Sequence, residues 1–300
     1  MAAELNLTYI TLGGHVELHK YRYLYFMIMF TVYILIICCN STIVCLICVH
    51  KNLHESMYIF IAALLMNSVL FSTGFYPKLL IDVLSEKKII SYAGCLFQAF
   101  LFYSLGCSEF LLLTAIAYDR YVSICKPLQY HTIMTKTKVI IAVVTAWLFS
   151  ACHILIAVAL SANRKLCDFN LKGIFCNNSV VKLQCVRSEV VAIRDLVYGV
   201  VILINVEILP VLFILFTYTK ILIICSQSSA DVRKKAAETC LPHLLVLISF
   251  SAMIITDVIM VRLESNIPKI VCFIISLQAI VCQPVFNPLI YGLKMKENNP

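Results

Sequence analysis

Long apolar runs alternate with short polar segments along almost the whole chain. A helix needs about 20 mostly apolar residues to cross the hydrocarbon core of a bilayer. Seven runs reach this length, and no polar segment between them could form a separate folded domain. The runs are roughly 24–49, 58–84, 95–125, 139–160, 193–225, 240–261 and 270–293. The pattern predicts an all-α integral membrane protein built as a bundle of seven transmembrane helices.

The same pattern divides the chain into three parts. Residues 1–22 form a polar N-terminal tail, residues 23–293 hold the spans, and residues 294–300 form a short polar tail. The start of the chain has no basic region followed by an apolar core and a small-residue cleavage site. We therefore expect no cleaved signal peptide, and the first span itself should direct membrane insertion.

Composition strengthens the membrane interpretation. Hydrophobic residues make up 61% of the chain and charged residues 13%, whereas soluble domains average about 45–50% and about 25%. The net charge is +8, which in a soluble protein would suggest nucleic acid as a partner. Here the basic residues fall in short gaps between apolar runs, where anionic headgroups explain them more simply. We expect a lipid bilayer as partner and no nucleic acid.

Glycosylation signals orient the chain better than its charges do. The lysine and arginine count favours neither orientation until the longest loop, residues 161–192, is set aside. Asn6 and Asn177 each begin an acceptor sequon, and both would lie on the same side as the N-terminus. We therefore expect the N-terminus outside and the C-terminus in the cytoplasm. A third sequon, at Asn40, lies inside the first span and should be unused.

Four of the fifteen cysteines fall on the expected outer side, namely Cys95, Cys167, Cys176 and Cys185. An even number of cysteines in an oxidising compartment indicates disulfides. The residues alone leave three pairings open.

The most specific motif follows the third span, from Ala117 to Leu128, and reads Ala-Tyr-Asp-Arg-Tyr-Val-Ser-Ile-Cys-Lys-Pro-Leu. An Asp-Arg pair at the end of an apolar helix is costly unless it is paired or functional. Alone, the pair is equally typical of an arginine that reaches to the lipid interface. The whole string resembles the signature that vertebrate odorant receptors, which are rhodopsin-like G-protein-coupled receptors, carry at the cytoplasmic end of their third helix.

The resemblance extends along nearly the whole chain, through motifs in the right order and at the right distances. In chain order they are Asn40, Leu53–Tyr58, Trp147, Pro210 with Tyr218, Lys235–Leu244 and Asn287–Tyr291. Ser56 stands where the family usually has proline, and the segment Gly74–Lys78 is most similar to odorant receptors of fish. By this resemblance, Cys95 pairs with Cys176, and Cys167 pairs with Cys185. We expect these bonds to serve folding and export.

The resemblance also implies an activation switch at the cytoplasmic end. Arg120 would pair with Asp119 at rest and turn toward the G protein and Tyr218 on activation. The residues of the implied activation switch are Asp119, Arg120, Tyr121, Tyr218, Asn287, Pro288 and Tyr291. Many relatives also lock this arginine with an acid at the base of helix 6. Here that region reads Arg233-Lys234-Lys235, so we do not expect such a lock.

Glu109 is an acid within the third span and matches a glutamate typical of the family. In the family it lies near an aspartate of helix 2, but Ser68 stands at that position here, with Asn67 beside it. Two interpretations remain open. Glu109 could contribute with Asn40 and Ser68 to a sodium site, or it could be a neutral acid bonded to Ser68 or Asn287.

The implied ligand pocket is a mostly apolar cavity in the outer half of the bundle. Its lining is Phe102, Tyr103, Gly106, Cys107, Ile202, Leu203, Val206, Ile254, Ile255, Val258, Leu277 and Ile280. For each of these residues, contact with lipid or another helix remains an open alternative. Glu207, Asp257 and Arg262 are further candidates for reading a polar ligand. We expect no catalytic residues, cofactor or metal, and interpret His153 and His243 as packing residues.

The resemblance implies an odorant receptor that binds a small molecule and activates a heterotrimeric G protein. The implied G protein is the stimulatory olfactory type, which raises cyclic AMP. The implied location is the plasma membrane of olfactory neuron cilia, reached with accessory export proteins. A non-olfactory receptor is one alternative, although an amine receptor would need an acid near Phe102. The sequence lacks the repeats and charge rings expected of a transporter or channel, and it lacks the motifs expected of an enzyme.

Overall fold

The computed structural model describes residues 8–16, 21–50, 55–185, 188–227, 230–263 and 268–297. It describes their side chains except at residues 230–233, 235–239, 242, 257–263 and 291–297. Asn6 therefore lies outside the described residues, and of Val258 and Tyr291 only the backbone is described.

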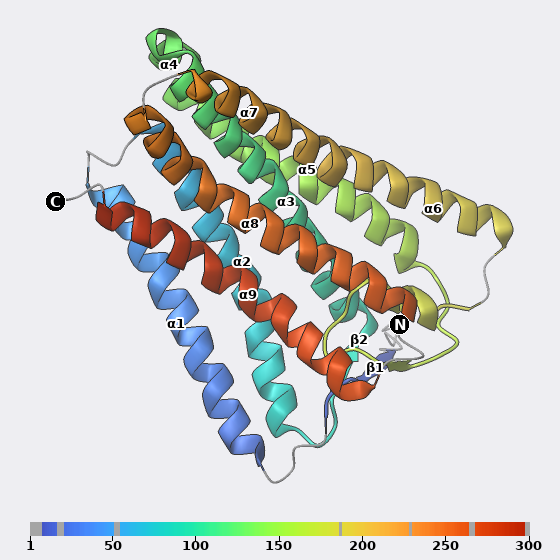
Figure 1. Cartoon of the computed structure of the whole chain (residues 1–300). Helices are drawn as coiled ribbons and strands as arrows, with labels where there is room; N and C mark the ends of the chain where they lie inside the picture. The colour runs from blue at the N-terminus through green and yellow to red at the C-terminus, as the bar shows by residue number, and fades with distance from the viewer. Residues whose placement is uncertain are drawn as a thin grey trace.

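Seven long helical passes form one bundle in the described part of the chain (Figure 1). Six of them are continuous: α1 (Arg22–Val49), α2 (Ser56–Leu84), α3 (Tyr92–Cys125), α5 (Lys136–Ala162), α8 (Ala230–Leu263) and α9 (Lys269–Glu297). The fifth pass joins α6 (Glu189–Leu203), the π-helical segment η5 (Ile204–Ile208) and α7 (Leu209–Ser226). The short helices η3 (Pro127–Gln129) and α4 (Tyr130–Ile133) link α3 to α5. Each apolar run of the sequence lies within one pass, which confirms the predicted seven-helix membrane bundle.

The outer surface of the bundle is apolar. Leu148 and Ile193 are each 60% exposed, and Phe216 is similarly open. Six described helices are long and apolar enough to cross a membrane, while α8 contributes a shorter apolar stretch, His243–Thr256. A water-soluble monomer rarely shows so much contiguous apolar surface. The chain is a multi-pass membrane protein whose helices turn large apolar side chains toward lipid.

Helix α3 occupies the centre of the bundle and packs against α2, α5, α7 and α8 (Figure 1). Leu112, Ile116 and Ala117 on this helix are fully buried. Ser91 begins α3 as its N-cap, because its hydroxyl accepts a hydrogen bond from the Gly94 N–H at 3.1 Å. Side chains along α3 can therefore contact residues from most other passes.

A small sheet closes one end of the bundle. Strand β1 (Tyr9–Leu12) lies in the middle, antiparallel to β2 (Ile89–Ser91) and parallel to β3 (Asn170–Leu171). Gly14 follows β1 and lies so close to Lys172 and Gly173 that a Cβ atom would collide with their backbone. We call the end of the bundle that this sheet closes the disulfide end. We call the opposite end, which holds Arg120, the Arg120 end. Because the number of passes is odd, β1 and the end of α9 lie at opposite ends (Figure 1).

Two disulfides hold the long loop at the disulfide end. Cys95 at the start of α3 is bonded to Cys176, and Cys167 is bonded to Cys185. These are the pairs that the family resemblance implies. Both Cys95 and Cys176 are fully buried, beside Ile10 of β1. The first bond therefore fixes the loop to the central helix, and the second closes the loop on itself.

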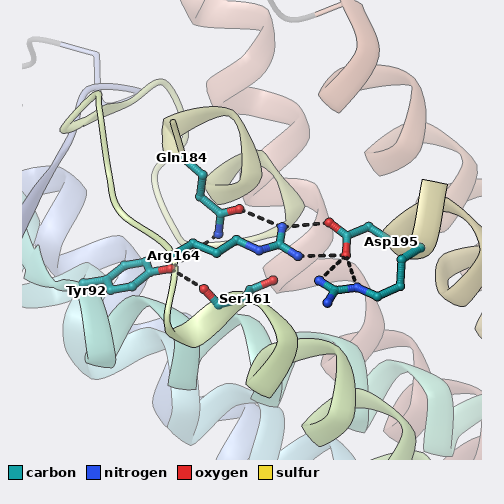
Figure 2. Close-up of polar contacts among 6 residues, drawn as sticks. Tyr92, Ser161, Arg164, Gln184 and Asp195 are labelled. Carbon is teal, nitrogen blue, oxygen red and sulfur yellow. Dashed lines mark hydrogen bonds and ion pairs between the residues drawn. The ribbon is translucent and has the colours of Figure 1, made fainter. Parts of the chain in front are cut away.

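A polar cluster fastens the same loop to three passes (Figure 2). Arg164, just beyond α5, forms a two-point ion pair with Asp195 of α6, with Nη1–Oδ2 and Nη2–Oδ1 distances of 2.7 Å. Arg164 also donates to Gln184 Oε1 at 3.0 Å. The Tyr92 hydroxyl of α3 donates to the Ser161 carbonyl at 2.9 Å. Two-point arginine–carboxylate pairs fix geometry as well as adding energy, so α3, α5, α6 and the loop are held in one arrangement.

Loss of the bond between α3 and the loop should impair folding. We predict that Cys176→Ser sharply lowers the fraction of receptor at the cell surface, measured by surface biotinylation, because removing a native disulfide costs about 2–5 kcal/mol in small secreted domains. Cys45→Ser is the matched control, since Cys45 is an exposed, free cysteine of α1. Equal surface fractions for both variants would contradict the prediction.

Candidate functional site

Glu109 of α3 lies at the centre of the bundle and is 0% exposed. Its Oε1 atom accepts a hydrogen bond from Asn287 Nδ2 at 2.9 Å. Its Oε2 atom accepts from Asn67 Nδ2 at 3.3 Å and from Gln283 Nε2. A carboxylate can only accept hydrogen bonds, and here three amide donors from α2 and α9 serve it.

The bonds around Glu109 extend into a wider network. Asn287 also donates to Ser68 Oγ at 3.0 Å. The Ser108 hydroxyl donates to Asn67 Oδ1 at 2.8 Å, and Asn67 donates to the Leu105 carbonyl at 2.9 Å. We call Asn67, Ser68, Ser108, Glu109, Gln283 and Asn287 the central polar network. It joins α2, α3 and α9 in the middle of the bundle.

Asn40 makes a separate link between α1 and α9. Pro288 has no N–H, so the carbonyl of Pro284, four residues earlier, loses its usual partner within the helix. Asn40 Nδ2 donates to that carbonyl at 3.0 Å, and also to the Ile36 carbonyl at 2.8 Å. A freed carbonyl inside a membrane must be satisfied by a neighbouring group, and the asparagine of α1 fills this role.

The sodium-site interpretation of Glu109 depends on which groups surround its carboxylate. The groups that face Glu109 are amide nitrogens, whereas a sodium ion would need oxygen ligands. Among the residues that the structure describes, none of the His, Cys, Asp and Glu side chains gather in threes or more to hold a metal ion.

At the Arg120 end, Asp119 is buried and both of its oxygens are bonded. Arg120 donates to Oδ2 through Nε at 3.1 Å and also through Nη2. The Tyr130 hydroxyl of α4 donates to Oδ1 at 2.9 Å. Burial and the nearby Asp119 carboxylate raise the pKa of Tyr130 to about 12, so the phenol keeps the proton that it donates.

Two further expected switch residues, Tyr218 and Tyr121, lie at the same end of the bundle. Tyr218 of α7 is buried and lies near enough to Arg120 for an electrostatic interaction with its guanidinium. Tyr121 is half-buried against the same hydrophobic core. Ser56, which replaces the family's proline, donates to the Met134 carbonyl at 3.3 Å and so joins the start of α2 to the segment after α4.

Several of the expected ligand-lining residues come together at the disulfide end. Phe102, Tyr103, Leu277 and Ile280 share one apolar cluster. Phe175, next to the disulfide-bonded Cys176, covers this cluster, with its ring centroid 5.1 Å from that of Phe102. The Tyr103 hydroxyl accepts a hydrogen bond from the Asn178 N–H at 3.0 Å. The long loop therefore lies directly over the expected pocket.

Other expected lining residues lie deeper or face outward. Gly106 lies against the Phe250 ring, and Val206 in η5 is buried. Cys107, Ile202 and Ile254 are half-buried. Leu203 and Ile255, by contrast, are 42% and 55% exposed. Successive helical residues are rotated by about 100° around the helix axis. Leu203 and Ile255 each come one residue after a half-buried residue, so their side chains point away from the rest of the expected lining.

Three residues escaped the sequence-based search. Tyr130, Ser108 and Gln283 each bond directly to a network residue or to Asp119. Gln283 precedes Asn287 by four residues, a spacing that places both on one helix face and could have identified it. Asn177, a glycosylation candidate, caps η4 (Asn178–Leu183) by accepting from the Ser179 N–H at 3.0 Å. Its glycosylation stays a prediction.

Comparison with known proteins finds matches that cover nearly the whole length of this chain. A family model described as olfactory receptor matches residues 29–299. Human olfactory receptor 6N1 is 32% identical over 277 residues, which cover 91% of this chain and 86% of that receptor. Human olfactory receptor 6K3 is 32% identical over 297 residues, covering 98% and 88%. Human olfactory receptor 4E1 is 33% identical over 293 residues, covering 97% and 90%.

The residues that the family model matches agree with the observed helical passes. The family model spans all seven passes except the start of α1. Family members are G-protein-coupled receptors for small odorants and are not enzymes, which agrees with the expected receptor class. This chain therefore belongs to the olfactory receptor family.

Proposed function

We propose that this chain binds a small odorant near the disulfide end and activates a heterotrimeric G protein at the Arg120 end. The Asp119–Arg120–Tyr130 cluster is the observation that carries the proposal. It is a charged pair, held by a third residue, at the Arg120 end of the central helix. A buried charge of this kind is costly inside a membrane protein and marks functional candidates.

The disulfides support an orientation with the N-terminus outside. Disulfides persist in oxidising compartments, so the end that carries Cys95–Cys176 and Cys167–Cys185 would face the cell exterior. The Arg120 end would then face the cytoplasm, where the G protein is. The expected destination is the plasma membrane of olfactory neuron cilia, with accessory proteins assisting export.

The odorant pocket would lie beside the aromatic cluster beneath the long loop. Phe102 contacts Phe71 and Phe175, with ring centroids 5.8 and 5.1 Å away. Small-molecule sites are mostly apolar, with a few polar groups that orient the ligand. Glu207, half-buried in η5 and near Cys107, would be one such polar group.

The central polar network would couple the pocket to the G-protein side. At a rise of 1.5 Å per residue, Glu109 lies about 10 Å along α3 from Phe102 and about 17 Å from Arg120. A ligand shifts a two-state receptor only if it binds one arrangement better. Contact at Phe102 would change how α3 sits against α2 and α9, and the Glu109 bonds would carry that change. We take the amide donors to satisfy Glu109 without sodium.

Arg120 should be required for signalling. We predict that Arg120→Ala abolishes the cyclic AMP response to pooled odorants in cells that express the stimulatory olfactory G protein, because it removes the guanidinium that turns to the G protein. The comparison is made at matched surface expression. Lys136→Ala is the control, since Lys136 is an exposed cation at the same end. A full response from Arg120→Ala would eliminate the switch assignment.

Tyr130 should restrain the resting state. We predict that Tyr130→Phe raises basal cyclic AMP, because Asp119 loses a hydrogen bond that contributes about 1.5–3 kcal/mol when one partner is charged. That corresponds to a shift of about tenfold or more in the resting-to-active ratio if the active state lacks the bond. Tyr118→Phe, which alters an exposed tyrosine one residue from Asp119, should leave basal activity unchanged. Equal basal activity in both variants would refute the restraint.

A further inference from the structure

A cavity of about 760 Å³ opens at the disulfide end. Four segments line it: the end of β1 with the residues after it, the loop between α2 and β2 with the first residue of β2, Asn170 of β3 and the start of α9. None of its lining residues belongs to the expected odorant pocket. Small-molecule sites typically have volumes of about 300–1,000 Å³. We call this cavity the vestibule.

The vestibule carries an excess of positive charge. Lys87, Lys88 and Lys269 line it, and Glu86 is the one acid among the described lining residues. Lys88 is half-buried, while Lys87 and Lys269 are exposed and can move to meet a ligand. Concave surfaces of one charge concentrate counter-ions and speed their capture. The charge therefore favours an anion.

His15 supplies a second, independent indication of a ligand. It lines the vestibule, is 9% exposed, and its Nε2 atom has no hydrogen-bond partner in the described part of the chain. Burial, with the charges of Lys88 and Lys78, lowers the pKa of His15 to about 4. The ring is therefore neutral at neutral pH, and in the tautomer that carries its proton on Nε2 this atom can donate one hydrogen bond. A buried donor without a partner is costly, and an anion's oxygen would satisfy it.

We propose that the vestibule binds a small organic anion, a carboxylate attached to an apolar body. The three lysines attract the carboxylate, and His15 donates a hydrogen bond to it. Leu12, Val16 and Ile270 in the same lining contact the apolar body. These apolar residues favour an organic anion over an inorganic one. The site rests on the proposed odorant-receptor function and names a ligand class for it.

The vestibule also adjoins the expected odorant pocket. The His15 ring contacts the Phe273 ring of α9, with centroids 6.4 Å apart. Phe273 belongs to the same apolar cluster as Phe102 and Ile280. An anionic odorant held in the vestibule would therefore be one aromatic ring away from the bundle interior.

Direct binding tests the proposal without relying on signalling. The full chain in phosphatidylcholine nanodiscs is titrated with millimolar hexanoate, hexan-1-ol or sodium sulfate, and the shift in unfolding temperature is measured, because a ligand stabilises the state that it binds. Hexanoate should raise the unfolding temperature, and the other two should not. An equal shift with sulfate would overturn the organic-anion assignment. No shift with hexanoate would overturn the site.

Variants locate the binding. The Lys87→Gln, Lys88→Gln, Lys269→Gln triple variant should weaken hexanoate binding by about tenfold, since exposed ion pairs are individually weak but add together. His15→Phe keeps a ring against Phe273 and should also weaken binding. Lys165→Gln removes an exposed lysine of the long loop outside the vestibule and should not. Unchanged affinity in the triple variant and in His15→Phe would overturn the assignment.

Lipid composition and signalling provide two further readouts. If phosphatidylserine in the nanodisc abolishes the hexanoate shift, a lipid headgroup fills the vestibule and the odorant assignment is wrong. If hexanoate binds as predicted but no odorant raises cyclic AMP, the failure belongs to the proposed signalling function and the vestibule stands.

Discussion

The buried carboxylate of Glu109 is the group on which the arrangement of the bundle depends. Lipid surrounds the helices and offers no hydrogen bonds, so every polar group in the interior must be satisfied by another part of the chain. Glu109 meets this requirement through Asn67 on α2 and through Gln283 and Asn287 on α9. Because these donors come from two different helices, the position of α3 and the positions of α2 and α9 are fixed together.

The same constraint explains features at both ends of the bundle. Asn40 satisfies the Pro284 carbonyl that Pro288 leaves free, so the proline-containing part of α9 is stabilised from α1. At the Arg120 end, Asp119 has both oxygens bonded, one by Arg120 and one by Tyr130. At the disulfide end, Arg164 and Asp195 satisfy one another where the loop meets the helices. Asn40 and Arg164 thus join segments separated in sequence, and Asp119 joins α3 to the short helix α4. A ligand that disturbs one of these contacts can alter another.

The sequence predicted the helices well because spanning a bilayer is a local requirement on length and polarity. It did not predict the β2–β1–β3 sheet, because strands of two to four residues leave a weak local pattern and their pairing is non-local. It identified Glu109, Asn287 and Arg120 through motifs, but missed Tyr130 and Ser108, which no motif marks. Leu203 and Ile255 turn outward because helical phase decides which neighbours face inward, and η5 alters that phase in the fifth pass.

A double-mutant cycle between Glu109 and Asn287 tests the role of the network most directly. The free energy of unfolding is measured on the purified receptor for Glu109→Gln, Asn287→Ala and the double variant. The control pair is Glu109→Gln with Thr256→Ala, because the Thr256 hydroxyl donates to a carbonyl of its own helix. If the Glu109–Asn287 bond joins α3 to α9, the effects should be non-additive by about 0.5–3 kcal/mol, while the control pair should be additive. Additive losses for Glu109 and Asn287 would show that the bundle does not depend on this bond.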